Sequence, residues 1–171
     1  MTISMYTVSI PVFVQHLTAL SANLDKAAAF AEARKIDPPV LLNMRLYPDM
    51  YPLVRQVQEA TKHAARVSGL LAGVTSPDMA NTEASLPELK ERIAKTIAFL
   101  ASLKPAQVDG TDDKEIKIAF SSGERTFTGQ SLLLHNALPN FYFHTTTAYD
   151  ILRHCGVEIG KRDFMGTPAK L

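Results

Sequence analysis

Cysteine, long apolar runs and blocks of like charge are scarce in this sequence. Cys155 is the single cysteine among 171 residues, which excludes an internal disulfide and suits a reducing compartment. No stretch approaches the roughly 18 uncharged apolar residues that span a bilayer, and the N-terminus lacks the basic and apolar regions of a secretory signal. Eighteen Lys and Arg balance seventeen Asp and Glu, and no basic stripe favours nucleic acid or an anionic membrane. We therefore expect a cytoplasmic protein.

Several catalytic signatures are missing as well. The sequence contains no GxSxG, no P-loop, no GxGxxG after a strand, no CxxC and no HExxH. With 46% hydrophobic and 20% charged residues, the composition is that of a globular protein. The length favours one domain over 1–171, long enough to bury a substantial core.

Apolar residues recur in steps of three and four in three stretches, the spacing that lines one face of a helix. The stretches are 10–31, 50–71 and 86–103. Ser85 and Glu88 form a capping box at the start of the third, where each satisfies an N–H group of the other end. The connections after the first and third helices are longer than simple turns need, so one crossover connection is expected.

The rest of the chain predicts a hairpin and a fourth helix. The period changes to two in "KEIKIAF", where Ile116, Ile118 and Phe120 alternate with charged or small residues, and "RTFTG" can pair with it after the turn "SSGE". A helix follows over about 130–154, kinked near Pro139 and ended by Gly156, before a loop-like tail in which Phe164 and Met165 dock. The pattern predicts an all-α four-helix bundle with a small β-hairpin between helices three and four.

The fourth helix carries two polar residues on a mostly apolar face. Asn140 and His144 are spaced i and i+4, so we expect His144 to point into the bundle. An unpaired buried polar group costs on the order of 1–3 kcal/mol, so the imidazole needs a partner. Gln56 and His63 on the second helix are the candidates. The residues leave two interpretations open: a hydrogen-bonded core histidine, or a metal site between facing helices.

Other polar residues are candidates for a pocket near this site. Asp49 is a good N-cap for the second helix, and Arg55 could help to recognise an anionic ligand at its entrance. Tyr149 is a packing residue with a polar tip that could also border the pocket. We interpret Cys155 as a small buried hydrophobic residue, and the alternative is that its thiol is a nucleophile.

Four stretches carry a resemblance to a known family. They are "MYTVSIPVF", "LLNMRLYPDMYPLVRQVQ", "ELKERIAKTIAFL" and "LPNFYFHTTTAYDILRHCGVEIGKRDFMG". The last includes His-x-x-x-Ala-Tyr-x-Ile-Leu-Arg-x-x-Gly. Together they resemble the DinB-like superfamily, and within it a bacterial branch defined only as a domain of unknown function.

This resemblance implies a metal site and an activity. In many members a divalent metal such as zinc or nickel is held by one histidine from helix two and a His-x-x-x-His pair from helix four. His144 matches the second histidine of the pair, whereas Asn140 stands at the first and Gln56 near the helix-two position. The implied activity is a metal-assisted transferase or hydrolase. The alternative is a non-catalytic ligand-binding or structural bundle, and we expect a homodimer with a small-molecule ligand.

Overall fold

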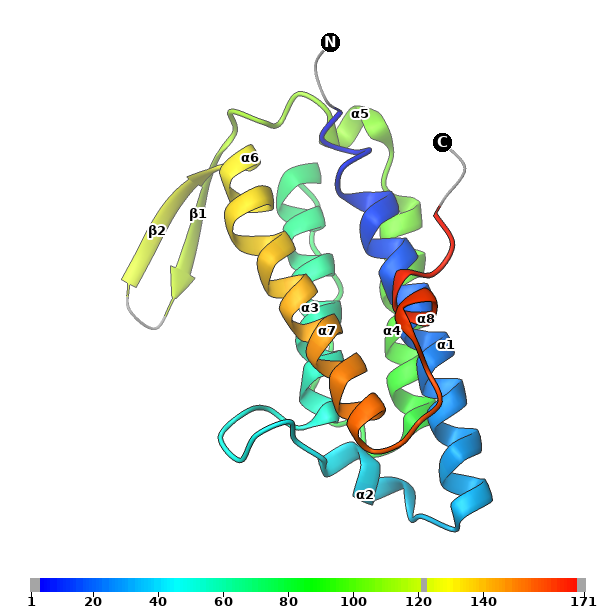
Figure 1. Ribbon diagram of the computed structural model, residues 1–171. Helices are drawn as coiled ribbons and strands as arrows, with labels where there is room; N and C mark the ends of the chain where they lie inside the picture. The colour runs from blue at the N-terminus through cyan, green and yellow to red at the C-terminus, as the bar shows by residue number, and fades with distance from the viewer. Residues whose placement is uncertain (1–3, 121–122, 169–171) are drawn as a thin grey trace.

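Four long helices form the body of the molecule, which the computed structural model describes for residues 4–120 and 123–168. The long helices are α1 (Ile10–Arg34), α3 (Leu53–Ala72), α4 (Leu86–Ser102) and α7 (Leu138–His154) (Figure 1). The shorter elements are α2 (Pro38–Asn43), α5 (Pro105–Val108), β1 (Glu115–Phe120), β2 (Gly123–Thr128), α6 (Gly129–Leu132), the π-helical turn η1 (Leu133–Ala137) and α8 (Lys161–Met165). The predicted four-helix bundle with a hairpin before its last long helix is confirmed.

The apolar stripes of the sequence form the core of the bundle. In α1, the predicted residues from Ile10 to Ala31 are all buried, and Phe13 and Leu17 are completely inaccessible. The Ser85 half of the predicted capping box of α4 is present, because the Glu88 N–H donates to Ser85 Oγ at 3.3 Å. The Glu88 carboxylate accepts from the N–H of Ala84, one residue earlier than predicted. Local sequence therefore determines where these helices begin and which face they bury.

The start of α3 differs from the prediction. The helix begins at Leu53 with Pro52 at its N-cap and no side-chain cap. Asp49, which we expected to cap it, is exposed in a turn of the preceding loop. Proline disfavours the α conformation in the residue before it, so Pro52 delays the helix beyond the position at which Asp49 could act.

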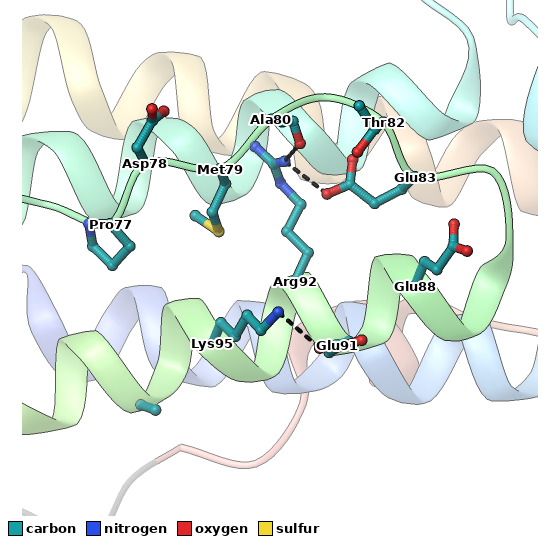
Figure 2. Close-up of a pocket in the computed structure, with 11 residues that line it drawn as sticks. Pro77, Asp78, Met79, Ala80, Thr82, Glu83, Glu88, Glu91, Arg92 and Lys95 are labelled. Carbon is teal, nitrogen blue, oxygen red and sulfur yellow. Dashed lines mark hydrogen bonds and ion pairs between the residues drawn. The ribbon is translucent and has the colours of Figure 1, made fainter.

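The long crossover connection is the segment 73–85. It follows α3, the second of the four long helices, whereas the sequence suggested a crossover after the first or the third. It runs back along α3 and α4, so these two helices are parallel, whereas α1 and α7 run the other way (Figure 1). Arg92, buried in α4, holds the segment through hydrogen bonds to the Ala80 carbonyl at 3.0 Å and the Glu83 carboxylate at 2.9 Å (Figure 2). Its Nε also donates to Thr61 Oγ1 of α3 at 2.7 Å, so one guanidinium joins three parts of the fold.

The fourth predicted helix is continuous but irregular. It comprises α6, η1 and α7, and η1 ends at Ala137, two residues before Pro139. Because proline has no N–H to donate, the register of hydrogen bonds shifts there: the Leu138 N–H reaches the Leu133 carbonyl, five residues back. The Asn140 side chain donates to the Asn136 carbonyl at 2.7 Å. At the position of the predicted kink the structure has a π-helical turn, which the hydrogen bond from the Asn140 amide stabilises.

The hairpin and the C-terminal segment both pack on the bundle. Ile116 and Ile118 of β1 are buried, as their alternation predicted, but the Phe120 side chain and residues 121–122 of the turn lie outside the described residues. The tail is not a simple loop, since 161–165 form α8 against α1. The Phe164 ring of α8 lies 5.3 Å from that of His16. None of the helices that the structure describes is long and apolar enough to cross a bilayer.

Candidate metal centre

Helices α3 and α7 pack against each other and bring four polar side chains together at their contact. Gln56, Glu59 and His63 follow one another on α3 at steps of three and four residues, so they share one face. His144 faces them from α7, with 7% of its surface exposed. The expected inward orientation of His144 is confirmed.

His144 is held by Gln56. Its Nδ1 lies 2.7 Å from Gln56 Oε1, and Gln56 Nε2 donates to the Tyr51 carbonyl at 3.0 Å. Because the amide nitrogen of Gln56 donates to the Tyr51 carbonyl, the amide oxygen faces His144 and accepts a hydrogen bond from its Nδ1–H group. In that tautomer Nε2 of His144 keeps its lone pair.

Glu59 and His63 add a carboxylate and a second imidazole beside His144. One ligand atom from each of the three side chains lies within 4.8 Å of the other two. Nε2 of His63 is 3.9 Å from Oε2 of Glu59. The rings of His63 and His144 are stacked, with centroids 5.6 Å apart and planes 17° from parallel. The three side chains thus converge on one point between α3 and α7.

Burial keeps both histidines neutral near pH 7. It lowers the pKa of His63, and the neighbouring His144 lowers it further, to about 4. Burial also lowers the pKa of His144. The Glu59 carboxylate, in contrast, is paired with Arg55 at 2.5 Å and lies 3.6 Å from Lys62. Neutral imidazoles next to a carboxylate are the protonation states that a metal ion requires of such ligands.

Of the other candidate residues, Arg55 contacts this cluster, whereas Asn140, Asp49 and Tyr149 have other environments. Asn140 is committed to the π-helical turn through its amide nitrogen, and Asp49 is exposed on the loop before α3. Arg55 contacts Glu59 and lies over the Tyr51 ring at 5.5 Å. Tyr149 packs its ring 5.8 Å from Phe164 of α8, so it does not join His144.

The structure also decides between the two interpretations of Cys155. Cys155 is half-buried against the core, and burial raises the pKa of its thiol, which suits a packing residue better than a nucleophile.

Glu59 was not among the predicted site residues. The signal was present, since Glu59 precedes His63 by four residues on the face that carries Gln56. A glutamate flanked by Arg55 and Lys62 is equally typical of the solvated face of a helix, so the sequence alone does not assign Glu59 to the site.

These features define a DinB-like helical bundle with a candidate metal centre between α3 and α7. The fold matches a crystal structure described as a DinB family member protein from Shewanella denitrificans, with a TM-score of 0.88 and 40% sequence identity over 97% of this chain and 94% of that chain. The family model described as "Domain of unknown function (DUF1993)" matches residues 5–165, so the chain belongs to this family. No curated protein matches the sequence significantly. The resemblance drawn from the sequence is confirmed.

Proposed function

We propose that the protein is a metal-dependent transferase or hydrolase whose metal is held by Glu59, His63 and His144. The observation that carries this proposal is the convergence of their ligand atoms within 4.8 Å. Two imidazoles and a carboxylate are the protein ligands of many catalytic zinc sites and of non-haem iron sites. Ligand atoms about 2 Å from such an ion lie roughly 4 Å or less from one another, so small side-chain rotations suffice to close the set.

Gln56 has an orienting role in this proposal, instead of the ligand role that we expected from the sequence. Its amide oxygen accepts a hydrogen bond from the Nδ1–H group of His144, which leaves Nε2 as the atom that can bind a metal. Hydrogen bonds of this kind fix the tautomer and the ring orientation of metal-binding histidines. Asn140 is likewise outside the proposed ligand set, because its amide nitrogen serves the π-helical turn.

The surrounding charges favour an anionic substrate. When bound, a divalent metal supplies a Lewis acid for group transfer or hydrolysis. Arg55 and Lys62 neutralise Glu59 and add positive potential at the site. Phe143, more than half exposed, places its ring 5.3 Å from that of His144 and offers an apolar surface next to the centre.

Metal content and zinc titration test the proposal. Protein purified without a metal-affinity tag is analysed for zinc, nickel and iron, then stripped with EDTA and titrated with zinc by calorimetry. We expect one equivalent per chain, lost in Glu59→Gln and in His63→Gln. Glu91→Gln is the matched control, since Glu91 is exposed and pairs with Lys95 on α4. Zinc affinity that is the same in Glu59→Gln as in the unaltered protein would refute the ligand set.

A non-catalytic bundle is the second candidate, and the His144–Gln56 hydrogen bond favours it. That bond satisfies the buried imidazole without any metal. The variant Gln56→Leu separates the two functions. A metal site predicts zinc affinity weakened roughly 10- to 100-fold, whereas a structural role predicts lost thermal stability with no zinc binding in either protein. We further propose a homodimer, which sedimentation equilibrium tests.

A further inference from the structure

A small cavity adjoins His63. It measures about 200 Å³, is partly open to solvent, and is bordered by α3, the end of α6, η1, the start of α7 and β1. At about 30 Å³ per water molecule, this volume equals that of roughly seven waters. A molecule of about eight non-hydrogen atoms fits such a space, which is smaller than the pockets that take drug-sized ligands.

The lining of the cavity combines an apolar wall with one cation and two amides. Val67, Leu70, Ile118, Leu132 and Ala137 form the apolar part. Arg66, Asn136 and Asn140 form the polar part, beside His63. The residues that line the cavity include no acidic side chain, so the only formal charge there is positive while the imidazole is neutral.

Two of these polar groups have unused hydrogen-bonding capacity. Arg66 is exposed, and within residues 4–120 and 123–168 it forms neither an ion pair nor a side-chain hydrogen bond. The Asn136 side chain also lacks a hydrogen bond within this part of the chain, although its backbone carbonyl accepts from Asn140. A guanidinium and an amide N–H₂ group that line one cavity together with apolar side chains match a carboxylate with a short hydrocarbon chain.

We propose that this cavity binds a short-chain carboxylate of about four to six carbons and that the substrates of the neighbouring centre carry such a chain. Arg66 pairs with the carboxylate, the Asn136 amide donates a further hydrogen bond, and the hydrocarbon chain lies against Val67, Leu70 and Ile118. The substrate assignment rests on the proposed function, since His63 is the residue that the cavity shares with the metal ligands. The binding itself does not depend on the metal.

Hexanoate is the probe, added to EDTA-treated protein and followed by ¹H–¹⁵N NMR. We expect saturable shifts, in the millimolar range, at the amides of η1, β1 and the second half of α3. Hexylamine, which has the same chain and the opposite charge, should not produce them. Arg66→Gln should weaken hexanoate binding about tenfold, and Arg34→Gln should leave it unchanged. Arg34 is a suitable control because it is exposed at the end of α1 and lies over Phe30.

The outcomes distinguish this site from the metal centre. Glu59→Gln should lose zinc and retain hexanoate, while Arg66→Gln should retain zinc. Hexanoate binding without zinc binding in the unaltered protein would leave the cavity assigned and refute the metal centre. The carboxylate proposal is overturned by an absence of shifts at tens of millimolar hexanoate, by equal binding of hexylamine, or by unchanged affinity in Arg66→Gln.

Discussion

The buried guanidinium of Arg92 should be the most sensitive polar position in the fold. Its side chain is 3% exposed, and it donates to Thr61 Oγ1, to the carbonyls of Ala80 and Gln58, and to the Glu83 carboxylate. Figure 2 shows the guanidinium reaching from α4 to the segment 73–85. Arg92→Met keeps most of the apolar stem while removing every one of these donors.

The size of the effect follows from what the substitution leaves behind. Glu83 is 12% exposed, and although burial alone would raise its pKa, hydrogen bonds from Arg92 and Gln58 hold the pKa below its ordinary value. Removing one partner of a buried ion pair costs about 3–5 kcal/mol. The whole molecule is stable by only about 5–15 kcal/mol. We therefore expect Arg92→Met to lose about 4 kcal/mol, a large share of the total.

Urea denaturation followed by far-ultraviolet circular dichroism measures this loss. Circular dichroism is needed because the sequence has no tryptophan, and urea is preferred to guanidinium because it does not screen charges. Lys95→Met is the control on the same helix, since Lys95 and Glu91 form an ion pair in which both side chains are mostly exposed. Such pairs contribute about 0–1 kcal/mol.

A double-mutant cycle with Glu83→Gln completes the test. If the pair acts as a unit, the double variant loses less than the sum of the two single variants, by at least about 1 kcal/mol. An Arg92→Met protein that unfolds at the same urea concentration as Lys95→Met would refute the reasoning, because the guanidinium would then make no net contribution beyond that of a surface charge.

Three further substitutions or conditions should affect stability in measurable ways. In Gly129→Ala, the new Cβ would lie 1.9 Å from the Thr111 carbonyl oxygen, so we expect a loss above about 2 kcal/mol, against almost none in Gly160→Ala, where no atom lies within 4 Å. Ser85→Ala should cost about 1 kcal/mol by removing the N-cap of α4, and a loss below the error of the urea midpoint would contradict the role assigned to its hydroxyl. The metal-free protein should lose stability as the pH falls from 6.5 to about 4, because the unfolded state takes up a proton on His63 near 6.5 and the folded state only near 4. The difference in pKa corresponds to a loss of roughly 3 kcal/mol in the free energy of unfolding. No such loss is expected above pH 6.5. Urea midpoints measured across this range should change less with pH in His63→Gln than in the unaltered protein.

Much of the fold could be predicted from the sequence because the relevant signals are local. The apolar spacing of α1, the cap at Ser85 and the proline at position 139 each act within a few residues of chain. The alternation of Ile116 and Ile118 likewise depends only on the pleat of one strand. The path of 73–85 could not be predicted in this way, because it depends on the buried contacts of Arg92 with Ala80 and Glu83 across the bundle.

The candidate site could likewise be predicted only in part from the sequence. His144 could be assigned to the interior from the apolar face of its own helix, and Gln56 could be proposed as its partner from its place on the second helix. The sequence could not show that Glu59 joins them, since its charge and cationic neighbours are equally typical of a solvated face. That assignment requires the relative rotation of α3 and α7 about their axes. Sequence alone therefore determined the helices and their buried faces, because helical periodicity is local. Only the tertiary structure decided which polar groups of two separate helices meet, because packing between helices sets that distance.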